Sequence, residues 1–273
     1  MGLAWLERNY ISLRTAEDVG FTGQHCEGAV TMRTSPHSKR TKITVDELLK
    51  QREQDPAYRA QMQELEKQRI AAAKEWNEAA APLMAELLSS GYNVKSLDVL
   101  ARSDACKDAV PILVKWLPKI MNSGVKESIV RALTVSWARP GAVAALLTEF
   151  RNTPDSANTG LKWAIGNALE VLASDEIFDD IVKLVQDKRH GIARQMLVIA
   201  LGKMKNPKAV DVLIYLLDDD DVVGQALTGL KKLRAKQART RIERLVNHPK
   251  AWVRKEVKQA LSKIENCEGV LES

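Results

Sequence analysis

The chain has 273 residues, of which 45% are hydrophobic and 28% charged, with a formal net charge of +6. This length and hydrophobic content are enough for one sizeable domain, or for one small domain with an extended appendage. Only 5% of the residues are aromatic, and the 14 Gly and 9 Pro are few. This argues against a β-sandwich or β-barrel, whose strands favour aromatic and β-branched residues between Gly-rich turns, so we expect an all-α protein.

The three cysteines, Cys26, Cys106 and Cys267, lie far apart and lack the spacing of a metal site, which favours a reducing cytosol. No apolar run approaches the roughly 20 residues that cross a bilayer. Glu7 and Arg8 fall where a secretory signal would be apolar. We therefore expect a soluble, cytoplasmic protein without a membrane partner.

The first region, residues 1–42, has neither a helical nor a strand period and contains scattered glycines. It ends in the basic stretch TSPHSKRTK, so we expect a flexible tail. His25 and Cys26 are adjacent, but no second pair follows nearby to complete a metal site.

A helical arm is predicted for residues 43–90. Thr44 and Glu47 have the spacing of a capping box, in which each side chain bonds the backbone of the other residue. The Asp-Pro pair that ends at Pro56 is typical of an N-cap with proline at the first helical position. The arm should therefore be a short helix followed by a long helix from about Pro56 to Leu88.

Apolar positions recur along this long helix at alternating spacings of four and three residues. The series is Tyr58, Met62, Leu65, Arg69, Ala72, Trp76, Ala79 and Leu83. Such a stripe either packs on the neighbouring domain or joins two chains in a coiled coil, and the arginine and the two alanines weaken the second interpretation. Pro82 should bend the helix because proline removes a backbone hydrogen bond.

The third region, residues 91–273, contains an internal repeat. Five copies of one environment are centred on Leu133, Leu169, Leu201, Leu230 and Leu261, which are 29 to 36 residues apart. The residue before each leucine is Ala or Gly, and apolar residues recur four and eight positions before it, which places them on one stripe of a helix. Second helices lie between these copies, so we predict an α-solenoid of about five helical hairpins.

Two stretches carry a family resemblance, HGIARQMLVIALGKMKNPKAVDVLIYLLDDD and AWVRKEVKQALSKIE. They resemble HEAT repeats of the short, phycobilin-lyase-like kind, in which a basic residue early in the second helix precedes an AL-G-x-[IL] ending. The resemblance is strong over residues 175–265 and weaker over residues 108–172. It implies the solenoid fold. It implies a scaffold or adaptor role for most such proteins, and a lyase or DNA glycosylase activity for a minority.

A basic column lies seven residues before the central leucines. It consists of Lys126, Lys162, Arg194 and Arg254, with Val223 in the fourth repeat. Two interpretations remain open. The column resembles the ladder of HEAT proteins that bonds acidic residues and carbonyl groups between repeats, with Asp187 as the candidate partner of Arg194. Alternatively, the basic side chains face a ligand.

A second column lies six residues before the central leucines, nearly opposite the apolar stripe. It consists of Glu127, Trp163, Gln195, Gly224 and Lys255. Trp163 should therefore be exposed on the inner, concave face of the solenoid, where it either anchors a partner or folds onto the next repeat. The partner-binding candidates on this face are Trp163, Asn167, Lys162, Glu170, Arg194, Arg131, Lys231, Arg254 and Lys255.

The positive charge is concentrated near the C-terminal end. Between residues 225 and 263, twelve Lys or Arg accompany only two Glu, so this segment carries about +10 and the rest about −4. One interpretation is a polar outer face that keeps a terminal repeat soluble. The other is a surface for an acidic protein or for nucleic acid phosphates.

The sequence is poor in catalytic patterns. Its four histidines are isolated, and it has no Ser-His-Asp order, no Gly-rich phosphate loop and no metal spacing. The acidic run Asp218–Asp221 falls where one helix hands over to the next, so we expect it to cap the second helix. We therefore expect a non-enzymatic scaffold without a cofactor, whose partner is another protein. The alternatives are an enzyme that resembles the HEAT-like alkylpurine DNA glycosylases, and a bilin lyase subunit.

Overall fold

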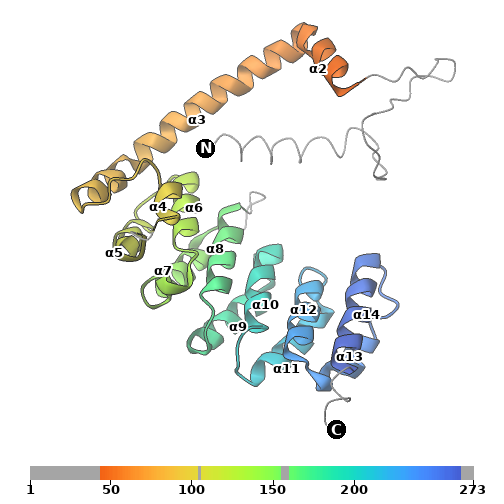
Figure 1. Cartoon of the computed structure of the whole chain (residues 1–273). Helices are drawn as coiled ribbons and strands as arrows, with labels where there is room; N and C mark the ends of the chain where they lie inside the picture. The colour runs from red at the N-terminus through yellow and green to blue at the C-terminus, as the bar shows by residue number, and fades with distance from the viewer. Residues whose placement is uncertain (1–43, 104–105, 155–159, 266–273) are drawn as a thin grey trace, which may run out of the picture. The chain divides into compact units, whose positions relative to one another are not determined.

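The computed structural model describes residues 44–103, 106–154 and 160–265. The predicted tail, residues 1–42, and two of the cysteines, Cys26 and Cys267, lie outside these residues. The regular structure in the described ranges is helical throughout, which confirms the all-α prediction (Figure 1). The chain divides into two units, Met1–Ala71 and Ala72–Ser273.

Each α-helix named below carries its number in Figure 1. The α-helices are α2 (Val45–Gln54), α3 (Pro56–Ser89), α4 (Leu97–Ala101), α5 (Cys106–Trp116), α6 (Ser123–Ala132), α7 (Arg139–Asn152), α8 (Gly160–Val171), α9 (Phe178–Gln186), α10 (Gln195–Leu201), α11 (Lys208–Tyr215), α12 (Val223–Leu233), α13 (Arg239–Glu243) and α14 (Ala251–Glu265). Short 3-10 helices are η1 (Ser136–Ala138), η2 (Asp175–Ile177), η3 (Lys188–Arg194), η4 (Leu216–Asp218) and η5 (Lys236–Ala238).

The two helices of the predicted arm begin at the expected caps. The backbone N–H of Thr44 donates to Oε2 of Glu47 at 2.9 Å, and the N–H of Glu47 donates to Oγ1 of Thr44 at 3.3 Å, so the capping box is formed. Asp55 accepts a hydrogen bond of 2.9 Å from the N–H of Ala57 at the start of α3. The long helix ends at Ser89, one residue beyond the predicted end.

The last part of α3 belongs to the second unit and packs into its core. Leu83 and Leu87 are fully buried, and Trp76 lies against α6, where its Cδ1 would be 3.3 Å from a Cβ at Gly124. Glu86 accepts hydrogen bonds of 2.8 Å from Nζ of Lys115 and from the indole N–H of Trp116. The stripe of the long helix is therefore a packing surface over this part.

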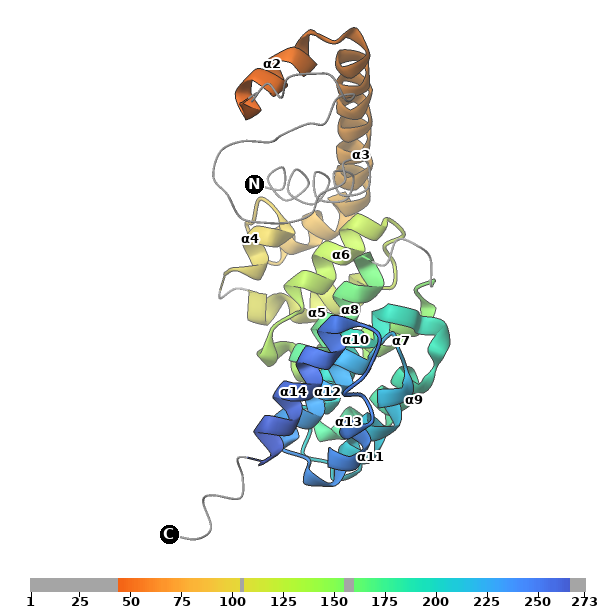
Figure 2. The same ribbon diagram turned by 90° about the vertical axis from the view of Figure 1, so that its right-hand side faces the viewer.

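The second unit consists of two rows of helices (Figures 1 and 2). In the even row, α4, α6, α8, α10, α12 and α14 pack on one another in that order. In the odd row, α7, α9, α11 and α13 each pack on the even helix that follows in the chain, which makes a helical hairpin. The five predicted repeat helices are α6, α8, α10, α12 and α14, so the solenoid prediction is confirmed, and α4 extends the even row by one more helix.

The core lies between the two rows and follows the predicted columns. Four central leucines, Leu133, Leu169, Leu201 and Leu230, are fully buried, and Leu261 is half-buried. The small residue before each leucine allows neighbouring helices to approach closely. The approach is close next to this column, where a Cβ added at Gly202 would lie 2.6 Å from Cα of Gly229.

No helix in the ranges 44–103, 106–154 and 160–265 has both the length and the apolar content needed to span a membrane.

A candidate binding surface on the even row

The basic column forms bonds inside the fold. Lys126 on α6 makes an ion pair with Glu149 on α7, and both side chains are largely buried. Arg254, at the start of α14, donates from Nη1 to the carbonyl oxygens of His248 at 2.7 Å and Pro249 at 2.8 Å. The Lys126 pair joins two repeats, as the ladder interpretation predicted, whereas the Arg254 contacts stay within the loop that leads into α14.

Arg194 is a fully buried member of this ladder, at 0% exposure. Its Nη1 donates to the carbonyl oxygen of Val185 and to Oδ2 of Asp219, both at 2.9 Å, and its Nε donates to the carbonyl oxygen of Gly191 at 2.9 Å. Two predictions were therefore wrong. Arg194 does not face a partner, and its acidic partner is Asp219 of the next repeat, because Asp187 is bonded to Arg189 at 2.6 Å.

The environment of Asp219 favours its ionised form. Burial alone would raise the pKa of this carboxyl group, but the hydrogen bonds from Arg194 and from the N–H of Asp221, together with the charge of Arg194, hold the pKa below its ordinary value. The arginine and the carboxylate are thus a charged pair that joins the start of α10 to the turn before α12.

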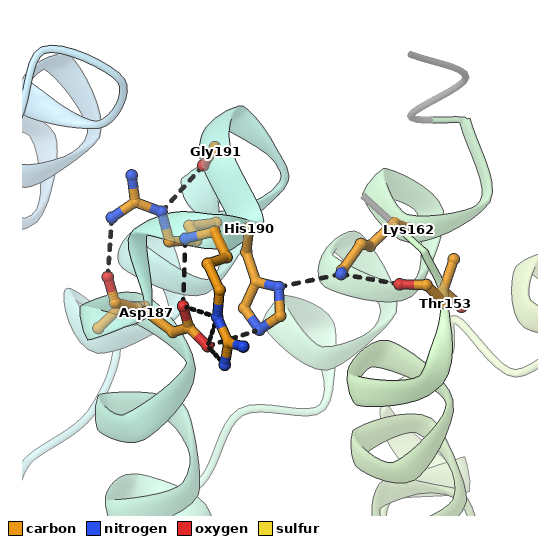
Figure 3. A network of polar contacts seen from close by, with 8 residues as sticks. Thr153, Lys162, Asp187, His190 and Gly191 are labelled. Atoms are coloured by element: carbon orange, nitrogen blue, oxygen red, sulfur yellow. Dashed lines mark hydrogen bonds and ion pairs between the residues drawn. The ribbon is translucent and has the colours of Figure 1, made fainter. Parts of the chain in front are cut away.

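Lys162 is also buried, at 2% exposure, so its predicted role in partner binding was wrong. Its Nζ donates to the carbonyl oxygen of Thr153 at 2.8 Å and lies 2.9 Å from Nδ1 of His190 (Figure 3). Since an ammonium group has no acceptor, Nδ1 of His190 must accept. The same ammonium group lies 5.1 Å from the centre of the Phe150 ring, so α7, α8 and η3 are tied together at this point.

The acidic run Asp218–Asp221 bonds neighbouring repeats, whereas we predicted a helix cap. The N-cap of α12 is Val222, which makes no side-chain hydrogen bond. Asp218 pairs with Arg241 of α13 at 2.5 Å, and Asp220 pairs with Lys250 at 3.3 Å. The hydrogen bond from Lys250 is the main reason that the pKa of Asp220 lies below its ordinary value.

Three further candidates are engaged in ion pairs. Glu170 is buried and paired with Lys203. On the exposed side of the even row, Arg131 pairs with Glu127 at 2.6 Å. Lys231 pairs with Glu256 at 3.1 Å and donates to Oε1 of Gln259 at 3.2 Å. The remaining candidates are Trp163, Asn167 and Lys255, whose side chains make no hydrogen bond or ion pair with the other residues that the structure describes.

Trp163 is 41% exposed, in agreement with its predicted position opposite the apolar stripe of α8. Asn167 lies one turn further along α8 and is half-buried. Within the residues that the structure describes, its amide makes no hydrogen bond. An indole and an amide with free bonding groups therefore lie side by side on the exposed side of α8.

Trp252 was missed at the sequence level. This residue is 51% exposed and comes from α14, but its ring lies on α12, where a Cβ at Gly224 would collide with Cζ3 and lie 3.0 Å from Cη2. Gly224 belongs to the same column as Trp163, so the ring of Trp252 fills the place that the glycine leaves open. The glycine in a column of otherwise large side chains was the sign of it in the sequence.

The basic residues gather at the far end of the even row. A shallow hollow between α12 and α14, here called the basic hollow, is lined by Lys231, Lys258, Gln259, Ser262 and Lys263. Lys255 is exposed one turn from Trp252. In the described part of the chain, Lys255, Lys258 and Lys263 form no ion pair.

Residues 143–228, from α7 to α12, match the family model described as HEAT repeats. These residues form the HEAT repeats of the solenoid. Outside the matched residues, α6 and α14 continue the even row and α13 packs on α14, whereas α5 packs on α7. A comparison with curated proteins gave no match.

Solved repeat structures are similar to this chain. A designed armadillo repeat protein has 16% identity over 69% of this chain and 91% of its own, with a TM-score of 0.40. An engineered protein has 20% identity over 62% of this chain and 87% of its own, with a TM-score of 0.42. A second designed armadillo repeat protein was solved in complex with the peptide (KR)4. It has 18% identity over 78% of this chain and 97% of its own, with a TM-score of 0.42.

Proposed function

We propose that this HEAT-repeat protein is a non-enzymatic scaffold or adaptor that binds another protein on the exposed side of the even row. The observation that carries the proposal is the position of Trp163. It lies on the side of α8 that faces away from the core, and 41% of its surface is exposed. Exposed tryptophans are enriched among the residues that dominate the free energy of protein interfaces.

The surroundings of Trp163 support a binding role. Asn167, one turn away, offers an amide that can donate and accept hydrogen bonds. The neighbouring charges, Glu127 and Arg131, are paired with each other and need no ligand to neutralise them. An apolar anchor beside a free amide and a neutral ion pair suits a protein surface better than a small charged ligand.

The alternative, an enzyme like the HEAT-like DNA glycosylases, finds less support. Such an enzyme needs a carboxylate that is free to react beside the exposed tryptophan. Glu170 is the candidate on α8, but it is buried and paired with Lys203. The basic hollow remains the feature that would favour a nucleic acid.

The first test compares binding with stability in the variant Trp163→Ala. Proteins that bind the immobilised full chain are identified by mass spectrometry, and the affinity of each for the wild type and the variant is measured. We expect the affinity to fall about thirtyfold, because an interface anchor contributes about 2 kcal/mol or more. The free energy of unfolding should stay within about 0.5 kcal/mol of the wild type.

Trp137→Ala is the matched control, since Trp137 is 37% exposed but lies in η1 rather than on the even row. It should leave the affinity unchanged. A loss of several kcal/mol of stability in Trp163→Ala would show that the ring is part of the packing. Release of an alkylated purine from a modified duplex, or duplex binding that falls by orders of magnitude between about 50 and 200 mM salt, would favour the nucleic-acid alternative.

A further inference from the structure

We infer that the even row takes an extended peptide segment with two apolar side chains five or six residues apart, followed by acidic residues on the side of α14. This inference rests on the proposed function and adds to it a second anchor, a spacing and a charge. The residues that carry it are Trp163, the pair Gly224 and Trp252, and the lysines at the end of the row.

The second anchor is Trp252. Its ring lies directly on the backbone of α12 because Gly224 has no Cβ, and half of its surface still faces solvent. A ring that is supported in this way loses little freedom when a partner covers it, which is the condition for a pre-organised anchor. Trp163 and the Trp252 ring are thus two apolar positions in one column of the repeat.

The spacing between the two anchors follows from the helix packing. Trp163 is on α8 and Gly224 is on α12, with α10 between them, and each of these helices packs on the next. Packed helix axes are about 8–10 Å apart, so the two anchors are about 16–20 Å apart. An extended chain advances about 3.3 Å per residue, so five or six residues of a peptide cover this distance.

The charge of the ligand follows from the lysines beyond the second anchor. Lys255 follows Trp252 on the same face of α14, and Lys258 and Lys263 line the basic hollow. None of the three is paired with an acidic group in the described part of the chain. At the other end of the row, Arg131 is neutralised by Glu127. Acidic residues of a peptide are therefore complementary to the α14 end alone.

The same observations disfavour a single-stranded nucleic acid. Bases of such a strand stack on aromatic rings while basic residues follow its backbone along the whole groove. Here the positive charge is confined to one end, because Lys162 is buried and Arg131 is paired. A peptide with its acidic residues at one end fits this distribution better.

The test selects peptides from a random library of 12-residue sequences displayed on phage, with the full chain as the target. We expect the selected peptides to carry aromatic or large apolar residues five or six positions apart and more Asp and Glu than Lys and Arg. Fluorescein-labelled copies of these peptides then give dissociation constants by fluorescence anisotropy for the wild type and the variants.

Two variants remove the second anchor in different ways. Trp252→Ala deletes the ring, and Gly224→Ala keeps the ring but displaces it with a Cβ. Each should weaken binding at least tenfold, whereas Trp137→Ala should not change it. The double variant Lys255→Glu, Lys258→Glu should weaken binding of the acidic peptides, and the loss of affinity should be larger at low salt. Circular dichroism and thermal unfolding confirm that each variant is folded before its affinity is used.

The outcomes separate this inference from the proposed function. If selected peptides depend on Trp163 but not on Trp252, or carry no acidic excess, the inference is wrong and the binding role of the row stands. If no peptide or protein binds in a way that depends on Trp163, the proposed function fails as well. If a labelled oligo-dT strand binds and Trp163→Ala and Trp252→Ala both weaken it, the ligand is a nucleic acid, which overturns the inference.

Discussion

Arg194 shows how a single charged side chain holds two repeats together. Its guanidinium group is fully buried between the end of α9 and the turn before α12, and it bonds two carbonyl groups and the carboxylate of Asp219. The donors of a guanidinium group sit on separate nitrogens in a fixed plane, here Nε and Nη1, and the single nitrogen of a lysine cannot reproduce that arrangement. Removing it leaves a buried carboxylate without a counter-charge.

We therefore expect Arg194→Met to lower the free energy of unfolding by about 3–5 kcal/mol, the usual cost of breaking a buried ion pair from one side. Urea unfolding followed by circular dichroism measures it. The same substitution at Arg189, whose side chain is 85% exposed, is the control and should cost no more than about 1 kcal/mol. Equal losses at the two sites would mean that the buried pair contributes no more than a surface pair.

The same pair predicts a pH dependence. The pKa of Asp219 in the folded state lies below its ordinary value, so its ionised form stabilises the fold. This contribution is fully present above the pKa of the unfolded chain, about 3.9, and is lost as the pH falls through the folded pKa. Asp219→Asn should thus be less stable than the wild type at pH 7, and the difference should shrink below about pH 4. Urea unfolding at both pH values checks this, and a constant difference would contradict it.

At the scale of the helix, the close contact between α10 and α12 depends on two glycines. A Cβ at Gly202 would lie 2.6 Å from Cα of Gly229, and neither backbone can move without separating the helices. Gly202→Ala should therefore cost about 1–3 kcal/mol, like other insertions into a packed core.

Gly141→Ala on α7 is the control for this prediction. A Cβ there would meet only a methyl group of Val110, at 3.5 Å, which is an ordinary contact. Because alanine favours a helix over glycine by up to about 1 kcal/mol, this variant should be as stable as the wild type or more stable. Thermal unfolding compares the two. A Gly202→Ala protein with an unchanged melting temperature would show that the helices can move apart freely.

The helices themselves could be predicted from the sequence because their determinants are local. The capping box at Thr44 and the periodic leucines depend on residues within two or three turns of one another. The exposure of Trp163 followed from the same periodicity. These features therefore agree with the structure to within one or two residues.

The contacts between repeats could not be predicted, because they depend on how far each helix slides along its neighbour. That offset decides that Arg194 meets Asp219 rather than Asp187, and that Trp252 lies over Gly224. It also decides that the Lys162 ammonium group meets a histidine and a carbonyl instead of solvent. The sequence shows which side of a helix a residue is on, and the stacking decides which neighbour it meets.

At the scale of the whole molecule, each repeat of the second unit packs mainly on its direct neighbours. The stability of such a stack is a sum of local terms, so damage at one end should stay local. Val257→Asp, which places a charge at a fully buried position of α14, should loosen α12–α14 and leave α6 and α8 intact.

Hydrogen exchange followed by mass spectrometry tests this prediction. The control is Lys258→Asp, which places the same charge at an exposed position of α14. In Val257→Asp, amides of α12–α14 should exchange faster and those of α6 and α8 at the wild-type rate. Faster exchange along the entire stack would show that the repeats unfold as one unit.

The position of the Trp252 ring over Gly224 depends on how α14 packs on α12. The ring belongs to α14 but rests on α12, so its position is set by the angle between two successive repeats. A rotation that moves the start of α14 away from α12 would lift the indole from the glycine and let water beneath it. Bending at this joint therefore changes both the anchor and its fluorescence, so a ligand that holds the ring down must also stiffen the joint.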